Sequence, residues 1–175
     1  INMTIETLAI LMPGDMGHGC AKAIQACGFR VVTNLTGRSG QTLGLSKEAD
    51  IEDLGSLEEV ARQADLILSI LPPEMAMGQA ISVANAMIAT GCRPPYADCN
   101  AISPASARRV GVEIARAGAT YVDAGIIGFN PVKEDGGTRF YVSGPDTSSV
   151  ETLNGRGVVV RRLGEEIGRA SAMKM

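Results

Sequence analysis

Residues 8–34, LAILMPGDMGHGCAKAIQACGFRVVTN, contain an apolar run, a glycine-containing turn, a helical pattern and a second apolar run. The first run, residues 7–12, carries no charge, which is typical of a strand buried on both faces of a sheet. Over residues 15–27 apolar and small side chains recur at helical spacing, and Gly28 follows as the usual glycine after a helix end. The stretch therefore predicts a strand, a helix and a second strand at 29–34.

The same alternation continues along the chain. Further strands are predicted at 50–54, 66–71, 95–100, 119–127, 138–144 and 157–164. Further helices are predicted at 41–49, 57–65, 75–90 and 103–118, with Ser56 and Glu59 forming a capping box, Ser103 as N-cap and Pro104 as first helical residue. This order indicates an α/β protein with a doubly wound, Rossmann-type, mostly parallel sheet over residues 1–164. Residues 165–175 are expected to begin one more helix.

The composition restricts the possible partners. The chain has 175 residues, 45% apolar and 20% charged, with a net charge of −3, which gives no reason to expect a nucleic-acid partner. No apolar run approaches the roughly 20 residues of a membrane span, and the start of the chain carries no secretory signal. The 4 cysteines and His18 match no common zinc spacing. We therefore expect a cytoplasmic protein with reduced thiols and no metal, membrane or nucleic-acid partner.

The turn MPGDMG (12–17) carries part of the dinucleotide-binding pattern G-x-G-x-x-G. Gly14 stands where the pyrophosphate approaches the backbone and Gly17 where helix and strand pack closely, whereas Met12 replaces the first glycine. Pro13 fixes its own φ and offers another way to shape the turn. Because the turn joins a strand to a helix N-terminus, a phosphate site is expected; an ordinary strand–helix turn is the alternative. The residues expected at this site are Pro13, Gly14, Asp15, Met16 and Gly17.

The end of the second predicted strand distinguishes NAD from NADP. A carboxylate there binds the ribose hydroxyls of NAD, whereas a nearby arginine accommodates the 2′-phosphate of NADP. Here the strand ends at Asn34 and the loop 35–42 contains Arg38 but no acid, with hydroxyl groups from Thr36 and Ser39. We expect these residues to bind NADP in preference to NAD; a solvated polar loop is the alternative.

Six motifs, in order along the chain, resemble those of the β-hydroxyacid dehydrogenase superfamily, which includes 3-hydroxyisobutyrate and 6-phosphogluconate dehydrogenases. They are PGDMG (13–17), ILPP (70–73), DCNAISP (98–104), DAGIIGF (123–129), GGTRFYVSG (136–144) and IGRASAMK (167–174). The resemblance implies an NAD(P)-binding Rossmann domain at 1–164. It also implies that 165–175 start the helix leading to an all-helical second domain, missing here, through which a homodimer forms.

The resemblance also implies roles for particular residues. Leu71, Pro72, Pro73 and Asn100 correspond to positions beside the cofactor. Asn100 and Ile127 replace two serines that hold substrate in the family, and Gly128 matches, so Asn100, Ile127 and Gly128 are the expected substrate contacts. Lys174 falls on the catalytic lysine, which acts as general base; a solvated lysine at a helix end is the alternative.

Three other polar residues are left with structural alternatives. His18 is expected on a helix face near the pyrophosphate rather than in catalysis. Asp98 and Asp123 end predicted strands, where ligands bind in open α/β sheets, but capping and turn roles are equally compatible with them.

The resemblance implies an NADP-dependent oxidoreductase that transfers hydride from a small 3-hydroxy acid. The substrate class includes sugar-derived acids, and loss of carbon dioxide follows in some members. This domain alone is expected to bind cofactor without turnover. The alternative is a non-catalytic module that binds or senses NAD(P)H, which Met12 and the two serine replacements favour. Lys174 favours the enzyme.

Overall fold

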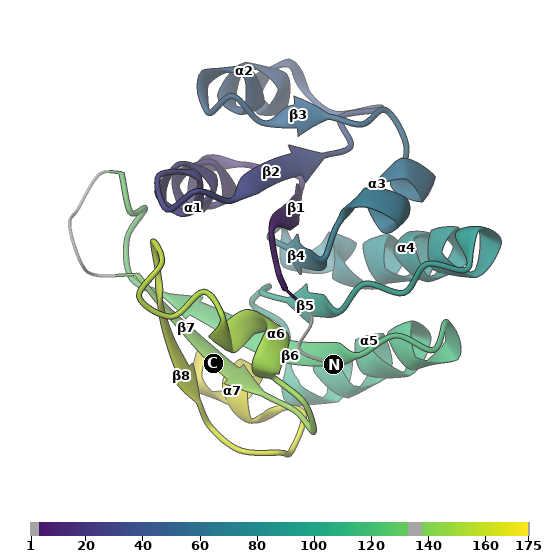
Figure 1. The fold of residues 1–175 in the computed structure, drawn as a ribbon. Coiled ribbons are helices and arrows are strands. Elements are labelled where there is room, and N and C mark those ends of the chain that lie inside the picture. The colour runs from purple at the N-terminus through teal and green to yellow at the C-terminus, as the bar shows by residue number, and fades with distance from the viewer. Residues whose placement is uncertain (1–3, 133–137, 175) are drawn as a thin grey trace.

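The computed structural model describes residues 4–132 and 138–174 (Figure 1). Within these residues, eight strands form one sheet in the order β3-β2-β1-β4-β5-β6-β7-β8, with helices on both faces. Neighbouring strands are parallel except for the antiparallel pair β6–β7. The predicted doubly wound, mostly parallel α/β sheet is confirmed, because the first six positions follow the Rossmann order 3-2-1-4-5-6.

The elements follow the predicted alternation with shorter bounds. The strands are β1 (Thr7–Leu11), β2 (Arg30–Thr33), β3 (Glu52–Asp53), β4 (Leu66–Ser69), β5 (Tyr96–Asp98), β6 (Tyr121–Ile127), β7 (Arg139–Ser143) and β8 (Val159–Arg162). The helices are α1 (Asp15–Gln25), α2 (Gly40–Glu48), α3 (Leu57–Gln63), the 3₁₀ turn η1 (Pro73–Met75), α4 (Ala76–Thr90), α5 (Pro104–Arg116), α6 (Ser148–Glu151) and α7 (Arg169–Lys174). The motif matched at 136–144 begins with two glycines that lie outside the described residues.

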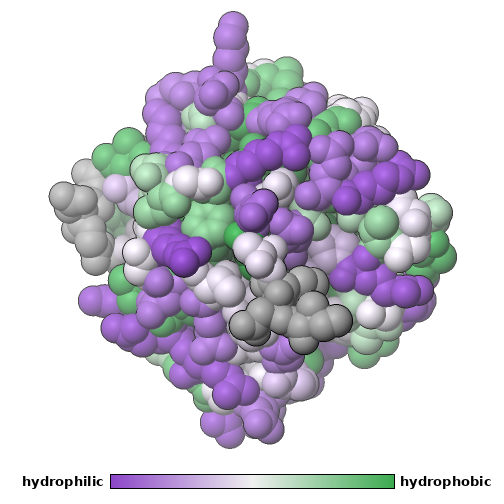
Figure 2. All heavy atoms as spheres, in the orientation of Figure 1, coloured by the Kyte–Doolittle hydropathy of each residue, from purple (hydrophilic) through white to green (hydrophobic). Residues whose placement is uncertain are grey.

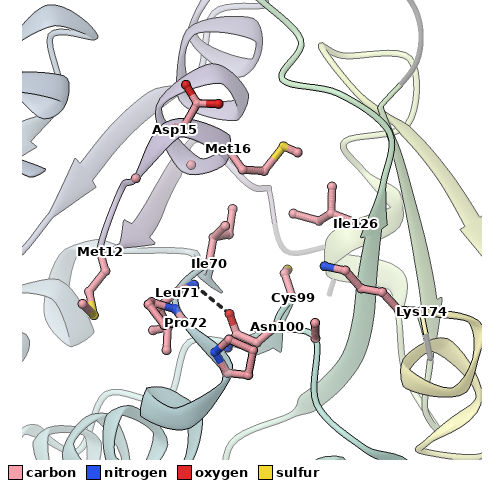
Figure 3. A pocket seen from close by; sticks show the side chains of 14 residues that line it. Met12, Asp15, Met16, Ile70, Leu71, Pro72, Cys99, Asn100, Ile126 and Lys174 are labelled. Atoms are coloured by element: carbon pink, nitrogen blue, oxygen red, sulfur yellow. Dashed lines mark hydrogen bonds between the residues drawn. The ribbon is translucent and has the colours of Figure 1, made fainter.

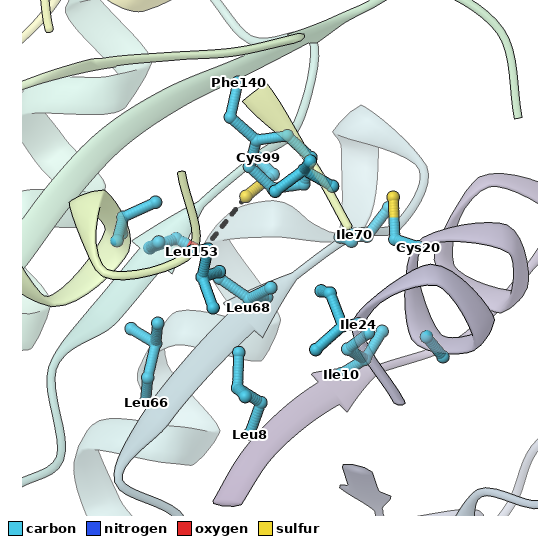
Figure 4. Close-up of a cluster of buried hydrophobic side chains, with 14 of the residues drawn as sticks. Leu8, Ile10, Cys20, Ile24, Leu66, Leu68, Ile70, Cys99, Phe140 and Leu153 are labelled. Atoms are coloured by element: carbon cyan, nitrogen blue, oxygen red, sulfur yellow. Dashed lines mark hydrogen bonds between the residues drawn. The ribbon is translucent and has the colours of Figure 1, made fainter. Parts of the chain in front are cut away.

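Two apolar layers hold the helices against the sheet. Alternate residues of a strand point to opposite faces, so β1 contributes to both layers. Leu8 and Ile10 belong to a buried cluster that also contains Ile24 of α1 and, farther along the sheet, Leu153 just after α6 (Figure 4). Residues of β1, β4 and β5 on the other face pack against α3, α4 and α5. Burial on both faces explains why the central strands read as continuous apolar runs.

Local capping follows the sequence in most respects. Ser103 caps α5, which begins at Pro104, by accepting a hydrogen bond within the first turn. The Ser56 hydroxyl accepts from the backbone N–H of Glu59 at 3.1 Å, so the predicted cap of α3 is confirmed. The other predicted hydrogen bond of the capping box, from the Ser56 N–H to the Glu59 carboxylate, is wrong. That carboxylate accepts hydrogen bonds from the side chains of Arg62 and Gln63 instead.

Candidate functional site

A cavity of about 350 Å³ opens at the carboxyl edge of the sheet, where the strand order reverses between β1 and β4 (Figure 3). Ligands of open α/β sheets bind at this kind of switch point. The turn after β1, the segments after β4 and β5, β6 and α7 all contribute to its walls. The predicted site residues that line it are Gly14, Asp15, Met16, Gly17, Leu71, Pro72, Pro73, Asn100 and Lys174.

The turn between β1 and α1 begins with a residue in the left-handed conformation, although that residue is not a glycine. Met12 has a φ of 53°, a conformation that glycine adopts at little cost and other residues rarely adopt. The Gly14 N–H donates to the Met12 carbonyl at 2.7 Å, closing a tight turn around Pro13. The tight turn therefore forms with a residue other than glycine at its first position.

The two remaining glycines fit the roles assigned to them. A Cβ built on Gly14 would have no atom within 4 Å, so the space above this residue is open to a ligand. A Cβ on Gly17 would lie 3.3 Å from Cγ2 of Ile10, which shows that α1 packs closely on β1 here. Gly14 is the N-cap of α1 and supplies no side-chain cap, leaving N–H groups of the first turn for an anion. The turn therefore fits a pyrophosphate.

The loop after β6 is anchored to α1 beside this turn. The Asn130 side chain donates to the backbone carbonyl of Asp15 at 2.7 Å and accepts from the N–H of Val132 at 2.9 Å. A Cβ on Gly19 would lie 1.9 Å from Asn130 Oδ1, so Gly19 makes room for this contact. Nothing in the local sequence pattern indicates the contact between Gly19 and Asn130, since the two residues lie far apart in the sequence.

The predicted 2′-phosphate residues lie apart from the cavity lining, between β2 and α2. Asn34 Oδ1 accepts from the N–H of Thr36 at 3.2 Å, and the Thr36 hydroxyl donates to the Gly55 carbonyl at 2.9 Å. Ser39 caps α2. Three of the four predicted side chains thus shape the loop itself.

Arg38 differs from its neighbours because its guanidinium reaches α4. Its Nη2 donates to Oε1 of the buried Gln79 at 3.0 Å. Its Nε is buried and has no hydrogen-bond partner among the described residues. Burial also lowers the pKa of Arg38 below its usual value. A half-buried guanidinium with an unpaired N–H suits an anion that would complete its hydrogen bonding.

Asn100 is fixed by hydrogen bonds to neighbouring residues at the wall of the cavity. Its Oδ1 accepts from the Leu71 N–H at 2.7 Å (Figure 3), and its Nδ2 donates to the Ser69 hydroxyl at 3.1 Å. Its own N–H donates to Asp98 at 2.9 Å. Asn100 therefore fixes the segment after β4 that lines the cavity, and only part of its hydrogen-bonding capacity is left for a ligand.

The end of β6 presents a different isoleucine from the one expected at the substrate site. Ile126 is buried and lines the cavity, whereas Ile127 is 38% exposed and, like Gly128, is absent from the lining. Neighbouring residues of a strand face opposite sides, so the shift by one position exchanges the face. The residues of β6 before Ile127 are all buried, so no alternation along the strand separates Ile126 from Ile127 in the sequence.

A row of four buried polar residues crosses the sheet beside the cavity. Ser69, Asp98, Asp123 and Ser143 are successive register partners on β4, β5, β6 and β7. Burial raises the pKa of Asp98 to about 6, and the neighbouring Asp123 charge adds to this effect, while the hydrogen bond from Asn100 opposes it. Asp98 therefore holds a proton more readily than an exposed aspartate does.

Lys174 lies at the end of α7, across the cavity from the N-terminus of α1. Its side chain extends towards Cys99 and Ile126 (Figure 3). His18 is buried away from the cavity, with Nε2 3.7 Å from the carboxylate of Glu48, the last residue of α2. The turn at Gly14 and Lys174 therefore line the same cavity, whereas His18 does not line it.

No group of His, Cys, Asp and Glu within residues 4–132 and 138–174 could hold a metal ion, and no helix in these ranges is long and apolar enough to span a membrane. The 4 cysteines are free thiols, two of them buried. On the face seen in Figure 2, apolar residues form scattered patches among polar ones.

Solved structures with this fold include a dehydrogenase, a reductive aminase and a protein of unknown function. One is a conserved protein of unknown function described as similar to 3-hydroxyacid dehydrogenases, with 29% identity, a TM-score of 0.84, and coverage of 96% of this chain and 61% of that chain. Mycobacterium tuberculosis 3-hydroxyisobutyrate dehydrogenase with L-serine has 20% identity, a TM-score of 0.78, and coverage of 97% and 58%. A reductive aminase from Aspergillus terreus with NADPH has 20% identity, a TM-score of 0.78, and coverage of 98% and 59%.

Each of these chains is longer than the present one, which spans about 60% of their length. The model of one family, the NAD-binding domain of 6-phosphogluconate dehydrogenase, matches residues 8–154. This range contains the turn at Gly14, the Arg38 loop and the segments after β4 and β5. The resemblance predicted from the motifs is confirmed, and the chain belongs to the family of NAD-binding domains of 6-phosphogluconate dehydrogenase.

Proposed function

We propose that this domain binds NADP and forms part of an oxidoreductase that transfers hydride from the carbinol carbon of a 3-hydroxy acid. One observation carries the proposal: the open backbone turn at Gly14 and the Lys174 side chain line opposite walls of one cavity. The turn suits a pyrophosphate, and the lysine suits a proton acceptor. The family match and the likeness to 3-hydroxyacid dehydrogenases support the same chemistry.

The residues that line the cavity have separate proposed roles in the reaction. The bound nicotinamide would supply the hydride acceptor. The N–H groups that begin α1 would bind the pyrophosphate, and Met16, Cys99 and Ile126 would provide an apolar wall that limits water. Lys174 Nζ would take the proton of the substrate hydroxyl, for which it must come within about 2.6–3.2 Å of that oxygen.

Preference for NADP over NAD is supported by Arg38. Its position after β2, its unpaired buried Nε and its tie to Gln79 favour a 2′-phosphate. An Arg38→Gln variant should bind NADPH at least ten-fold more weakly, equivalent to about 1.4 kcal/mol, because it loses charge-assisted hydrogen bonds. Its affinity for NADH should change less than two-fold.

The test is a titration of wild type and variant with NADPH and NADH, followed by nicotinamide fluorescence; the chain has no tryptophan to interfere. Lys22→Gln, on the outer side of α1, serves as the matched control for loss of one positive charge. Equal loss of both cofactors in Arg38→Gln would contradict the 2′-phosphate assignment. Wild-type affinity for neither cofactor would contradict the proposed function as a whole.

A second candidate is a module that senses NAD(P)H without catalysis. It is favoured by the hydrogen bonds that occupy Asn100 and by the apolar Ile126, where a polar substrate contact would be useful. Lys174→Ala in the longer protein separates the two candidates. An enzyme loses turnover and keeps its cofactor affinity, whereas a sensor shows no turnover in either form.

The broader setting of the domain is also proposed. The coverage of about 60% of the related structures supports a further domain, and the homodimer formed through it is a proposal that rests on the resemblance alone. Four free cysteines support a reducing compartment such as the cytoplasm.

A further inference from the structure

We propose that Asp123 is the residue that positions Lys174, because its carboxylate binds the N-terminal turn of the helix that carries the lysine. The role of Lys174 rests on the proposed function, whereas the attachment of α7 to Asp123 does not.

Asp123 is 1% exposed and lies in β6. Its Oδ2 accepts hydrogen bonds from the Gly168 N–H at 2.8 Å, the Ser171 N–H at 3.1 Å and the Ser143 hydroxyl at 3.0 Å. Its Oδ1 accepts from the Ser171 hydroxyl. The carboxylate thus joins β6 and β7 to the beginning of α7, and both of its oxygens are occupied.

These contacts matter because they lie at the N-terminal turn of α7. Its first N–H groups need external acceptors, and a negative charge at this end also interacts favourably with the helix dipole. Asp123 meets both needs, and Ser143 accepts from the Ala170 N–H at 3.0 Å.

A second feature of β6 brings α7 close to the sheet. Gly125 lies two residues after Asp123 and therefore on the same face of the strand. A Cβ on Gly125 would be 3.1 Å from the Ala170 carbonyl oxygen and 3.9 Å from Cβ of Lys174. Asp123 fixes the start of α7 and Gly125 admits its next turn, so the place of Lys174 at the cavity follows from β6.

The neighbouring carboxylate provides the comparison. Asp98 is the register partner of Asp123 and is equally buried. None of the hydrogen bonds found for Asp98 reaches α7 within the described part of the chain, and its Oδ2 has no partner there. Removing Asp98 and removing Asp123 delete the same chemical group from adjacent strands, but only the second removes the acceptors of α7.

The experiment compares Asp123→Ala with Asp98→Ala in the full chain. In Asp123→Ala, amide hydrogen exchange of residues 168–174 should become at least ten-fold faster, because two buried N–H groups lose their acceptor. Asp98→Ala should leave exchange there within two-fold of wild type. Asp123→Asn should show an intermediate change, since its amide oxygen can replace Oδ2 while the charge is lost. Unchanged exchange at 168–174 in Asp123→Ala would overturn the proposal.

Selective acetylation of Lys174, with NADPH at saturation or absent, reads out the position of the lysine. Bound NADPH should slow wild-type acetylation at least five-fold, and this shielding should be lost in Asp123→Ala, while NADPH affinity changes less than three-fold. Shielding retained in Asp123→Ala would contradict the positioning role. No shielding in wild type would overturn the proposed cofactor site alone, because faster exchange of α7 in Asp123→Ala would still support its attachment to Asp123.

Circular dichroism reports whether each variant folds. If Asp123→Ala does not fold, Ser171→Ala and Asp123→Asn carry the test, because Ser171→Ala removes one α7 donor and leaves the sheet unchanged. Both should then give intermediate exchange at 168–174 and partial loss of shielding. Wild-type behaviour of both would overturn the proposal.

Discussion

Replacing Gly14 by alanine should separate stability from cofactor binding. The residue has a φ of −78° and a ψ of −159°, which alanine adopts without strain, and the added Cβ would touch nothing within 4 Å. Alanine gains about 0.4–1 kcal/mol by restricting the unfolded chain. It loses roughly 0.5 kcal/mol as a poorer N-cap than glycine. The free energy of unfolding should therefore change by no more than about 0.5 kcal/mol.

The effect on binding should be much larger. The methyl group would stand in the open space through which a pyrophosphate reaches the first turn of α1. A hydrogen bond to a charged group contributes about 1.5–3 kcal/mol, so the loss of even one such bond weakens binding at least ten-fold. We expect Gly14→Ala to bind NADPH and NADH more weakly by this factor or more.

The assay combines thermal unfolding with fluorescence titration. A stability change of 0.5 kcal/mol or less corresponds to a shift in Tm of about 2 °C at most for a domain of this size. Gly44→Ala is the matched control, since Gly44 lies in α2, also has open space at its Cβ, and is remote from the cavity. Its affinity should not change. A Gly14→Ala variant that binds NADPH as tightly as wild type would refute the reasoning.

Two further predictions concern stability. Gly19→Ala should destabilise the domain by about 1–2 kcal/mol, because the new Cβ displaces Asn130 from its hydrogen bonds. In an Asn130→Ala background the same change should be neutral or stabilising. Urea denaturation of the wild type, the two single variants and the double variant tests this as a double-mutant cycle. Burial raises the pKa of Asp98 from 3.8 to about 6 in the folded state, so its protonated carboxyl contributes stability that is fully present below pH 3.8 and is lost as pH rises through 6. The loss attributable to Asp98 is about 3 kcal/mol, and Asp98→Asn should remove it; similar pH profiles of the unfolding free energy between pH 4 and 7 for both proteins would contradict the assignment.

The fold could be predicted because burial on both faces leaves a clear record in the sequence. The runs at β1 and β4 are continuous and apolar, and Ser56 and Ser103 mark helix starts at which the backbone needs acceptors. Helix α6 was not predicted because its four residues are too few to show a helical period. Periodicity therefore located the long elements and missed this short helix.

The site was only partly accessible to the same reasoning. The turn at Gly14 is local, so spacing and context indicate it. The tie between Arg38 and Gln79 joins residues 41 positions apart, and the bond from Ser171 to Asp123 joins residues 48 apart. No sequence period encodes such pairs. Strand alternation alone does not decide whether Ile126 or Ile127 lines the cavity, because every residue of β6 before Ile127 is buried.

The left-handed conformation of Met12 has a consequence for how this domain is compared with others. A non-glycine residue in this region costs about 1–2 kcal/mol, and the surrounding turn must offset that cost. The turn is thus formed by a residue other than the glycine that the sequence pattern requires. Domains of this kind are better sought by backbone geometry at the first strand–helix junction than by counting glycines.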